Sequence, residues 1–198
     1  MLGLNIHIHQ PAPQNTTYKD HFELTHEIIE TPLGPMMAIG DNEALYLLEF
    51  TDRKHIDAQI NRVAKHTKRP IIAATAKTSS AAIKSIKTEL KSYFSGELKT
   101  FQTPRMMTGT DFQKEVWSAL CDIPYGETIA YADLAVNIGN EKATRAVASA
   151  NGRNGFAIII PCHRVISKNG GLGGYAGGLS RKSWLLDHEA RRSGHILI

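Results

Sequence analysis

Residues 156–166 form an apolar run, FAIIIPCHRVI, that a cysteine, a histidine and an arginine interrupt. Three consecutive isoleucines are typical of a strand that is buried on both faces, so we predict a strand over 158–160 that ends at Pro161, which cannot donate to a sheet ladder. In a regular strand, Cys162 and His163 would point to opposite faces. The run therefore predicts either a structural cysteine or a nucleophile that works with a nearby base.

A glycine-rich segment, SKNGGLGGYAGG, follows this run. Glycine allows close approach of a ligand or backbone, and Tyr175 within the segment offers an aromatic face. We therefore consider a thiol at Cys162 in a pocket that an aromatic loop closes. The other cysteine, Cys121, lies on a predicted apolar helix and is interpreted as structural. Two cysteines so far apart predict neither a disulfide framework nor a thiolate zinc site, and they fit a reducing compartment.

The chain has 198 residues, of which 42% are hydrophobic, and this is enough for a substantial core in one domain or two small ones. Because it has neither a bilayer-length apolar stretch nor the pattern of a signal peptide, we expect a cytoplasmic protein without membrane contact. The net charge is +4, and basic residues concentrate in 139–182. This concentration indicates either a polyanionic partner or a solvated positive face.

Residues 1–20 are polar and contain two prolines, which predicts a flexible N-terminal extension. Residues 21–104 are predicted to form an α/β domain with a small antiparallel sheet. The segment 31–50 has two apolar runs around a Gly-Asp-Asn breaker, which predicts a hairpin. Helical patterns cover 53–69 and 79–94.

Residues 105–198 are predicted to form a second, mostly helical domain. Thr110 and Gln113 have the spacing of a capping box at the start of a helix. Short helices predicted at 131–137 and 141–150, joined by a turn with glycine, indicate a helix-turn-helix. We expect this domain to be winged-helix-like. The second of them is rich in alanine, which is typical of close helix packing or of a helix that presses against a minor groove. The fold class is therefore α/β (α+β).

Four stretches together resemble the O6-alkylguanine-DNA alkyltransferases over residues 110–189: FQKEVWSALCDIPYGETIAYADLA, ATRAVASANGRN, IPCHRVI and GYAGGLSRKSWLLDHE. Over 28–104 the resemblance is weaker and rests on TPLGPMMAIG and LLEF. It implies direct repair of DNA in which a cysteine takes the alkyl group from guanine O6, with O4-alkylthymine left open as a substrate. The thioether product does not hydrolyse, so each molecule acts once. The implied partner is double-stranded DNA that contains O6-alkylguanine.

The resemblance implies no cofactor and a monomer, with cooperative binding along DNA left open. It also implies roles for individual residues. Cys162 matches the nucleophile, His163 matches a base that acts through a water, and Glu189 matches the carboxylate that orients this histidine. Asn154 matches an asparagine that supports the active-site turn. Tyr131 matches a hydroxyl that donates to the departing guanine.

The remaining matches concern base flipping from the minor groove. Arg145 matches the arginine that takes the place of the flipped base. Clearance for the DNA backbone is expected at Thr144, Ala146 and Ala148. The residues expected to face the flipped base or the DNA are Val165, Tyr175, Ala176 and Lys182.

Two features depart from the family pattern. Residues 155–157, Gly-Phe-Ala, replace a common Pro-x-Pro after Asn154, which predicts a looser turn, and Ala176 lacks the hydroxyl of some members. Some relatives hold zinc near the N-terminus, but the first half of this chain has no cysteine, so we predict no metal site. His7 and His9 could pair on a metal but lack a third ligand.

Three other interpretations stay open. A non-catalytic relative would bind alkylated DNA, but such proteins replace the nucleophile, and this chain keeps Cys162. A thiol hydrolase would act repeatedly on acyl substrates, which leaves the helix-turn-helix unexplained. A transcriptional regulator would need a second DNA-reading motif, which residues 1–104 do not offer. We also predict that alkylation of Cys162 destabilises the fold, because an added carbon strains a packed pocket.

Overall fold

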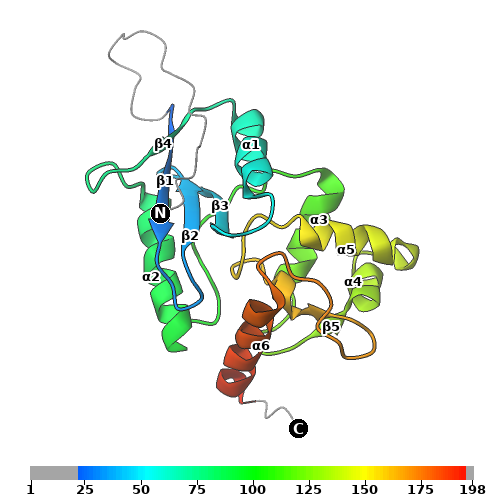
Figure 1. The fold of residues 1–198 in the computed structure, drawn as a ribbon. Coiled ribbons are helices and arrows are strands. Elements are labelled where there is room, and N and C mark those ends of the chain that lie inside the picture. Colours follow the sequence, from blue (N-terminus) through cyan, green and yellow to red (C-terminus); the bar gives the residue numbers. More distant parts are fainter. Residues whose placement is uncertain (1–21, 195–198) are drawn as a thin grey trace.

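The computed structural model describes residues 22–194, so the predicted N-terminal extension and the pair His7 and His9 lie outside the described residues. Figure 1 shows a sheet with α1 and α2 in one part of the molecule and α3 to α6 in the other. The main sheet contains β1 (Leu24–Ile29), β2 (Met36–Gly40), β3 (Leu45–Phe50) and β4 (Ile71–Ala73), and a second pair consists of β5 (Ile129–Ala130) and β6 (Val165–Ile166). The helices are α1 (Ile56–Thr67), α2 (Ala81–Ser95), α3 (Asp111–Cys121), α4 (Tyr131–Asn137), α5 (Thr144–Gly152) and α6 (Leu179–Ser193), with short 3-10 helices η2 (Glu141–Ala143) and η3 (Cys162–Arg164).

The main sheet has the strand order β3-β2-β1-β4. The predicted hairpin is confirmed as the antiparallel pair β2 and β3, whose connecting turn is held by the Asp41 carboxylate, which accepts from the main-chain N–H groups of Glu43 and Ala44. The predicted antiparallel sheet is present in β1, β2 and β3, but β4 at its edge pairs in parallel with β1. The connection through α1 returns the chain in the direction of β1, so the sheet is mixed.

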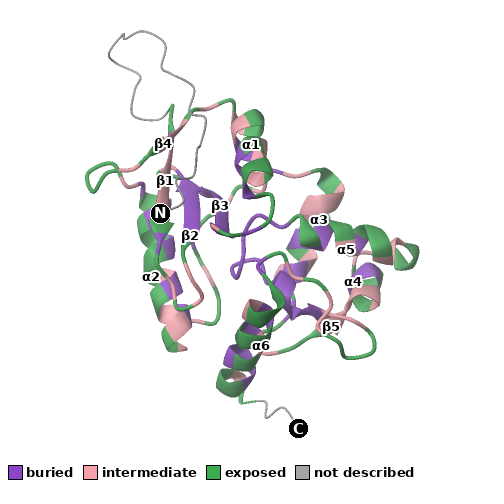
Figure 2. Cartoon of the chain, viewed as in Figure 1, coloured by how far each residue is buried: buried purple, intermediate pink, exposed green. Residues whose placement is uncertain are grey.

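Both faces of the sheet are covered, which explains why β2 and β3 are apolar throughout. Met36 and Ala38 belong to a core cluster with residues of α2, whereas Met37 and Ile39 belong to a second cluster with residues of α1. This alternation follows from the two-residue period of a strand. Figure 2 shows both strands buried along their length.

The predicted helices are confirmed with small shifts at their ends. Gly96 ends α2 with φ 87°, a left-handed conformation that glycine adopts without strain. Thr110 and Gln113 form the predicted capping box at the start of α3. The helix-turn-helix is present as α4 and α5, with η2 as an extra first turn. Helix α6 was not predicted, and the winged-helix-like arrangement stays a prediction.

The two halves share one core. The larger cluster contains Phe50 and Ile83 from the first half together with Trp117, Ile160 and Leu185 from the second. The predicted domain boundary near residue 104 thus lies within a continuous packing unit, and the boundary itself stays a prediction. No helix in the described part of the chain is long and apolar enough to span a membrane.

Candidate active site

The predicted strand at 158–160 is wrong, although its burial is right. Residues 157–159 form a turn, in which Ile160 N donates to Phe156 O over 3.0 Å and Ile158 adopts φ 73°. The Asn154 side chain holds the two ends of this turn together: its amide donates to Ile160 O at 2.9 Å and its oxygen accepts from Phe156 N at 2.9 Å. Tertiary contacts therefore override strand propensity here.

Cys162 follows this turn at the start of η3 and is 6% exposed. Its sulfur lies 3.2 Å from the Asn154 amide nitrogen, which donates to it. Burial raises the pKa of the Cys162 thiol to about 11, against the lowering effect of the Asn154 hydrogen bond. The resting group is therefore a protonated thiol at neutral pH, and it needs a base at the moment of attack.

His163 is the next residue in the chain and is fully buried, and its Nε2 lies 2.8 Å from Oε1 of Glu189. Burial lowers the pKa of His163 in spite of the Glu189 carboxylate, so the imidazole is neutral at neutral pH. Since a carboxylate can only accept, Nε2 carries the proton and Nδ1 carries the free lone pair. Nδ1 is buried and has no protein partner within residues 22–194.

Besides His163, two other side chains donate hydrogen bonds to Glu189. Arg164 donates from Nε to Oε2 at 2.7 Å and from Nη2 to Oε1 at 3.1 Å, while the Tyr93 hydroxyl donates to Oε1 at 2.8 Å. Burial alone would raise the pKa of Glu189, but His163 and Arg164 hold it well below its usual range. The carboxylate therefore stays charged. Sequence reasoning missed Arg164 and Tyr93 as parts of the site.

The glycine-rich loop brings Tyr175 and Tyr131 to the same region. Tyr175 is half-buried and its ring meets the His163 ring edge-on at a centroid distance of 6.4 Å. The Tyr131 hydroxyl lies 3.5 Å from Gly174 O. Burial, and then the neighbouring Cys162, raise the pKa of Tyr131, so its hydroxyl keeps its proton.

Lys182, for which contact with the flipped base or the DNA was expected, lies inside the protein. It is fully buried, and its ammonium donates to the carbonyls of Val165 at 2.5 Å and Gly174 at 3.3 Å. Burial lowers the pKa of Lys182 to about 8. The lysine thus connects the strand after Cys162 to the glycine-rich loop and is not available to a phosphate in this structure. The hydrogen bond from Lys182 occupies the main-chain carbonyl of Val165, a residue that was expected to face the base.

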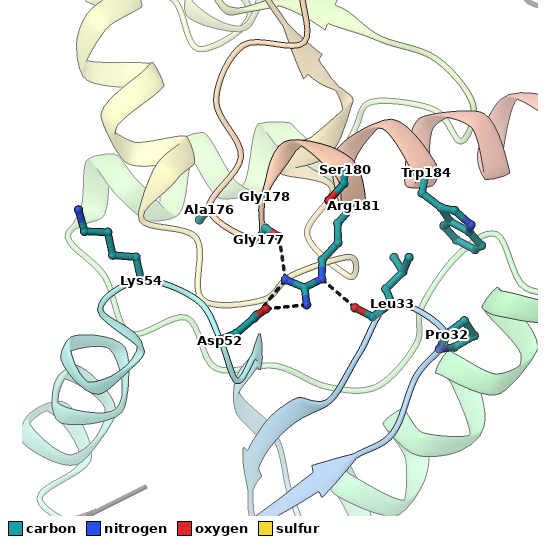
Figure 3. Close-up of a pocket in the computed structure, with 10 residues that line it drawn as sticks. All are labelled: Pro32, Leu33, Asp52, Lys54, Ala176, Gly177, Gly178, Ser180, Arg181 and Trp184. Atoms are coloured by element: carbon teal, nitrogen blue, oxygen red, sulfur yellow. Dashed lines mark hydrogen bonds and ion pairs between the residues drawn. The ribbon is translucent and has the colours of Figure 1, made fainter. Parts of the chain in front are cut away.

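The other end of this loop is anchored to the first half of the chain. A pocket of about 700 Å³ lies between the two halves of the chain. Figure 3 shows Arg181 reaching from α6 across this pocket, with Ala176 at its edge. Its guanidinium donates to both Asp52 oxygens, at 2.8 and 2.9 Å, and to the Leu33 and Gly177 carbonyls. Arg181 therefore ties the loop that carries Tyr175 to the β3–α1 connection.

Helix α5 presents the predicted DNA-facing residues. Arg145 and Ala146 are exposed, and Thr144 and Ala148 are partly exposed. The opposite face of the helix is buried through Val147 and Ala150. Arg145 makes no side-chain hydrogen bond or ion pair with the described residues, so its guanidinium can reach a ligand outside the chain.

The part of the chain that the structure describes holds no group of three His, Cys, Asp or Glu side chains suited to a metal ion. Cys121 lies on α3, where its sulfur accepts from Arg105 Nη2 at 3.4 Å. The prediction that Cys121 lies on a helix is confirmed. The site thus consists of one buried thiol, a neutral imidazole and a held carboxylate, together with two tyrosines.

Comparison with known proteins identifies the family to which the chain belongs. A family model described as the DNA-binding domain of 6-O-methylguanine DNA methyltransferase matches residues 111–191. A methylated-DNA–protein-cysteine methyltransferase of Methanosarcina acetivorans is 44% identical over 163 residues, which cover 82% of this chain and 96% of that protein. The chain belongs to the methylated-DNA–protein-cysteine methyltransferase family. The protein of the same name from Salmonella typhimurium is 40% identical and covers 88% of this chain and 98% of its own length.

A solved structure has the same fold as this chain. Mycobacterium tuberculosis OGT in complex with DNA matches with a TM-score of 0.73 and 38% identity, over 85% of this chain and 94% of that chain. Family membership confirms the resemblance seen in the sequence, the α+β fold class and the DNA methyltransferase function. The roles of single residues stay predictions.

Proposed function

We propose that the protein repairs O6-alkylguanine in double-stranded DNA by moving the alkyl group irreversibly to Cys162. The observation that carries the proposal is the set of hydrogen bonds at Cys162, His163 and Glu189. Asn154 donates to the sulfur, and the adjacent His163 has Nε2 committed to Glu189 and Nδ1 left free to act as a base. A thiol, a base and a group that orients the base are the parts that a nucleophilic site needs.

In the proposed reaction, Nδ1 of His163 takes the thiol proton through a water, which neighbouring residues can share without direct contact. The sulfur then forms a bond to the alkyl carbon as the bond from that carbon to guanine O6 breaks. The Tyr131 hydroxyl stabilises the charge that develops on the departing guanine, which takes up a proton from solvent while the imidazolium releases the thiol proton. Glu189 stabilises the imidazolium that forms, because its carboxylate is already charged. The thioether at Cys162 ends the reaction after one turn.

The proposed DNA contact uses α5. Guanine O6 is out of reach inside a duplex, so the base has to be extruded toward Cys162 and Tyr175. Arg145 would occupy the vacated place, and the short side chains of Thr144, Ala146 and Ala148 would let the helix approach the minor groove. We further propose that one chain suffices, since every group of the site comes from the same chain. A cytoplasmic location stays a prediction.

The test is a titration of the protein with an excess of duplex that contains O6-methylguanine, in which repaired guanine is counted per protein molecule. The proposal predicts that repair stops at one guanine per chain. Cys162→Ser should repair none and still bind the duplex, whereas the matched control Cys121→Ser should behave like the wild type. Repair that continues beyond one guanine per chain, or full activity of Cys162→Ser, would refute the proposal. Repeated hydrolysis of an ester would favour the thiol hydrolase.

A further inference from the structure

A buried arginine from the first half of the chain contacts the active-site turn. Arg53 lies between β3 and α1 and is 6% exposed. Its guanidinium donates from Nη1 to Asn154 O at 2.6 Å and from Nη2 to Gly152 O at 2.8 Å. Both acceptors are main-chain carbonyls that flank the end of α5, roughly one hundred residues away in the chain.

The charge of Arg53 is balanced within the same half of the chain. Glu49, which is 2% exposed, forms an ion pair with Nη1 of Arg53. A buried guanidinium is stable only when its donors and its charge both find partners, and here a carboxylate and two carbonyls supply them. The planar fork of arginine can serve all three acceptors at once, which a lysine ammonium on a flexible stem cannot reproduce.

Strand β3 adds a second contact to the same turn. Leu48 N donates to Gly155 O at 2.9 Å, and Ala157 N donates to Leu48 O at 2.8 Å, so Phe156 forms a bridge with the strand. A proline at position 157, as in the common family pattern, would lack the second donor. The turn that the sequence predicts to be loose is therefore held from outside by β3.

We infer that Arg53 and strand β3 are positioning elements for the nucleophile: they fix the turn whose Asn154 side chain donates to Cys162. Arg53 holds the Asn154 main chain, and Asn154 in turn contacts the sulfur at 3.2 Å. The first half of the chain thereby takes part in the chemistry without touching the substrate. This inference rests on the proposed role of Cys162.

Two variants of Arg53 test the inference. Arg53→Lys keeps the charge but loses the two-carbonyl anchor. Arg53→Met combined with Glu49→Leu removes both charges, which avoids an unpaired buried carboxylate and keeps the fold. The matched control is Arg69→Met, because Arg69 also pairs with a carboxylate, Asp41, and donates to main-chain carbonyls in the first half of the chain.

The first measurement is the rate of methyl transfer at saturating damaged duplex. Because small displacements of a reacting group are costly, we expect both Arg53 variants to lose about 10- to 100-fold in rate. Their dissociation constants for the same duplex with ordinary guanine should not change, and Arg69→Met should keep the wild-type rate. A wild-type rate in the folded double variant would overturn the inference.

The second measurement is hydrogen exchange of the main-chain amides in 154–162, which needs no DNA. Faster exchange in this segment in both Arg53 variants, with α2 unchanged, supports the inference, whereas unchanged exchange in 154–162 overturns it. The two measurements also separate the proposals. If the wild type takes up no methyl group, the proposed function fails, and the exchange data still decide whether Arg53 holds the turn.

Discussion

The active-site turn and helix α5 are neighbours in the chain, but the polar side chains of the turn are buried and hydrogen-bonded, whereas Arg145 on α5 is exposed. In and beside the turn, Asn154 and Arg164 are buried, and their side chains are bonded to several protein atoms. On α5, Arg145 is exposed and has no side-chain partner within residues 22–194. The difference shows how the two tasks are divided. Reacting groups need a fixed, desolvated frame, whereas a group that meets DNA has to stay free until the partner arrives.

The largest effect is expected from a substitution in the buried hydrogen-bond network of the active site. Glu189→Gln leaves the Arg164 guanidinium buried without its carboxylate, and removal of one partner of a buried pair costs about 3–5 kcal/mol. We therefore expect a loss of this size in the free energy of unfolding, measured in urea at pH 7, together with loss of methyl transfer. The control is Asp52→Asn at the Arg181 pair, where the Asp52 side chain is 65% exposed and the cost should stay below about 1 kcal/mol. Equal losses in the two variants would contradict the account of the frame.

The next effect concerns the exposed side of the comparison. Arg145→Ala should lower the rate of repair in duplex DNA by about 10- to 100-fold, because the flipped base loses the side chain that replaces it. The free energy of unfolding should change by no more than about 0.5 kcal/mol, since the residue is exposed. Reaction with free O6-methylguanine base should match the wild type. If the variant also reacts more slowly with the free base, Arg145 takes part in the chemical step. This would contradict the claim that buried groups carry out the chemistry and that Arg145 acts only on the DNA.

Two alanines of α5 sharpen the comparison within a single helix. Ala146 is exposed, whereas Ala150 is 2% exposed. Ala146→Leu should weaken DNA binding about tenfold through loss of clearance and leave stability unchanged. Ala150→Leu should destabilise the fold by about 1–3 kcal/mol through overpacking. Fluorescence anisotropy with a labelled duplex measures DNA binding of the two variants, and thermal melting measures their stability. The reverse assignment of effects would contradict the proposed orientation of α5 on DNA.

The smallest effect is the dependence of stability on pH. The unfolded chain protonates His163 near pH 6.5, whereas its pKa in the folded state is lower. Stability is therefore complete above pH 6.5 and falls as the pH drops below it, by at most about 1.4 kcal/mol per pH unit for one proton. Urea unfolding between pH 8 and 5 measures this slope. His26 and His188 also have lowered pKa values, so His163→Gln should reduce the slope and not abolish it. An unchanged slope would show that folding does not lower the pKa of His163.

Local signals in the sequence predicted much of the fold. The capping box at Thr110 and the glycine at Gly96 act within a few residues, so they can be seen in the chain alone. The strand predicted at 158–160 failed because three buried isoleucines suit a turn as well as a strand, and the choice depends on the side chain of Asn154.

The site could be predicted only in part. Cys162 and His163 are adjacent in the sequence, and the family resemblance supplied Glu189. Tyr93 was missed because it lies ninety-six residues from the carboxylate it contacts. The burial of Lys182 could not be predicted, because a lysine is usually exposed, whereas here its ammonium donates to two carbonyls. Contacts of this kind appear only once distant segments are packed together.

The most direct test of the central claim is to locate the transferred group on the protein. The wild type is mixed with duplex that contains O6-methylguanine, digested, and sequenced by tandem mass spectrometry. The account predicts one added CH2 unit on the Cys162 sulfur and an unmodified Cys121. A methyl group on Cys121 or on His163, or repaired DNA without any modified residue, would contradict it.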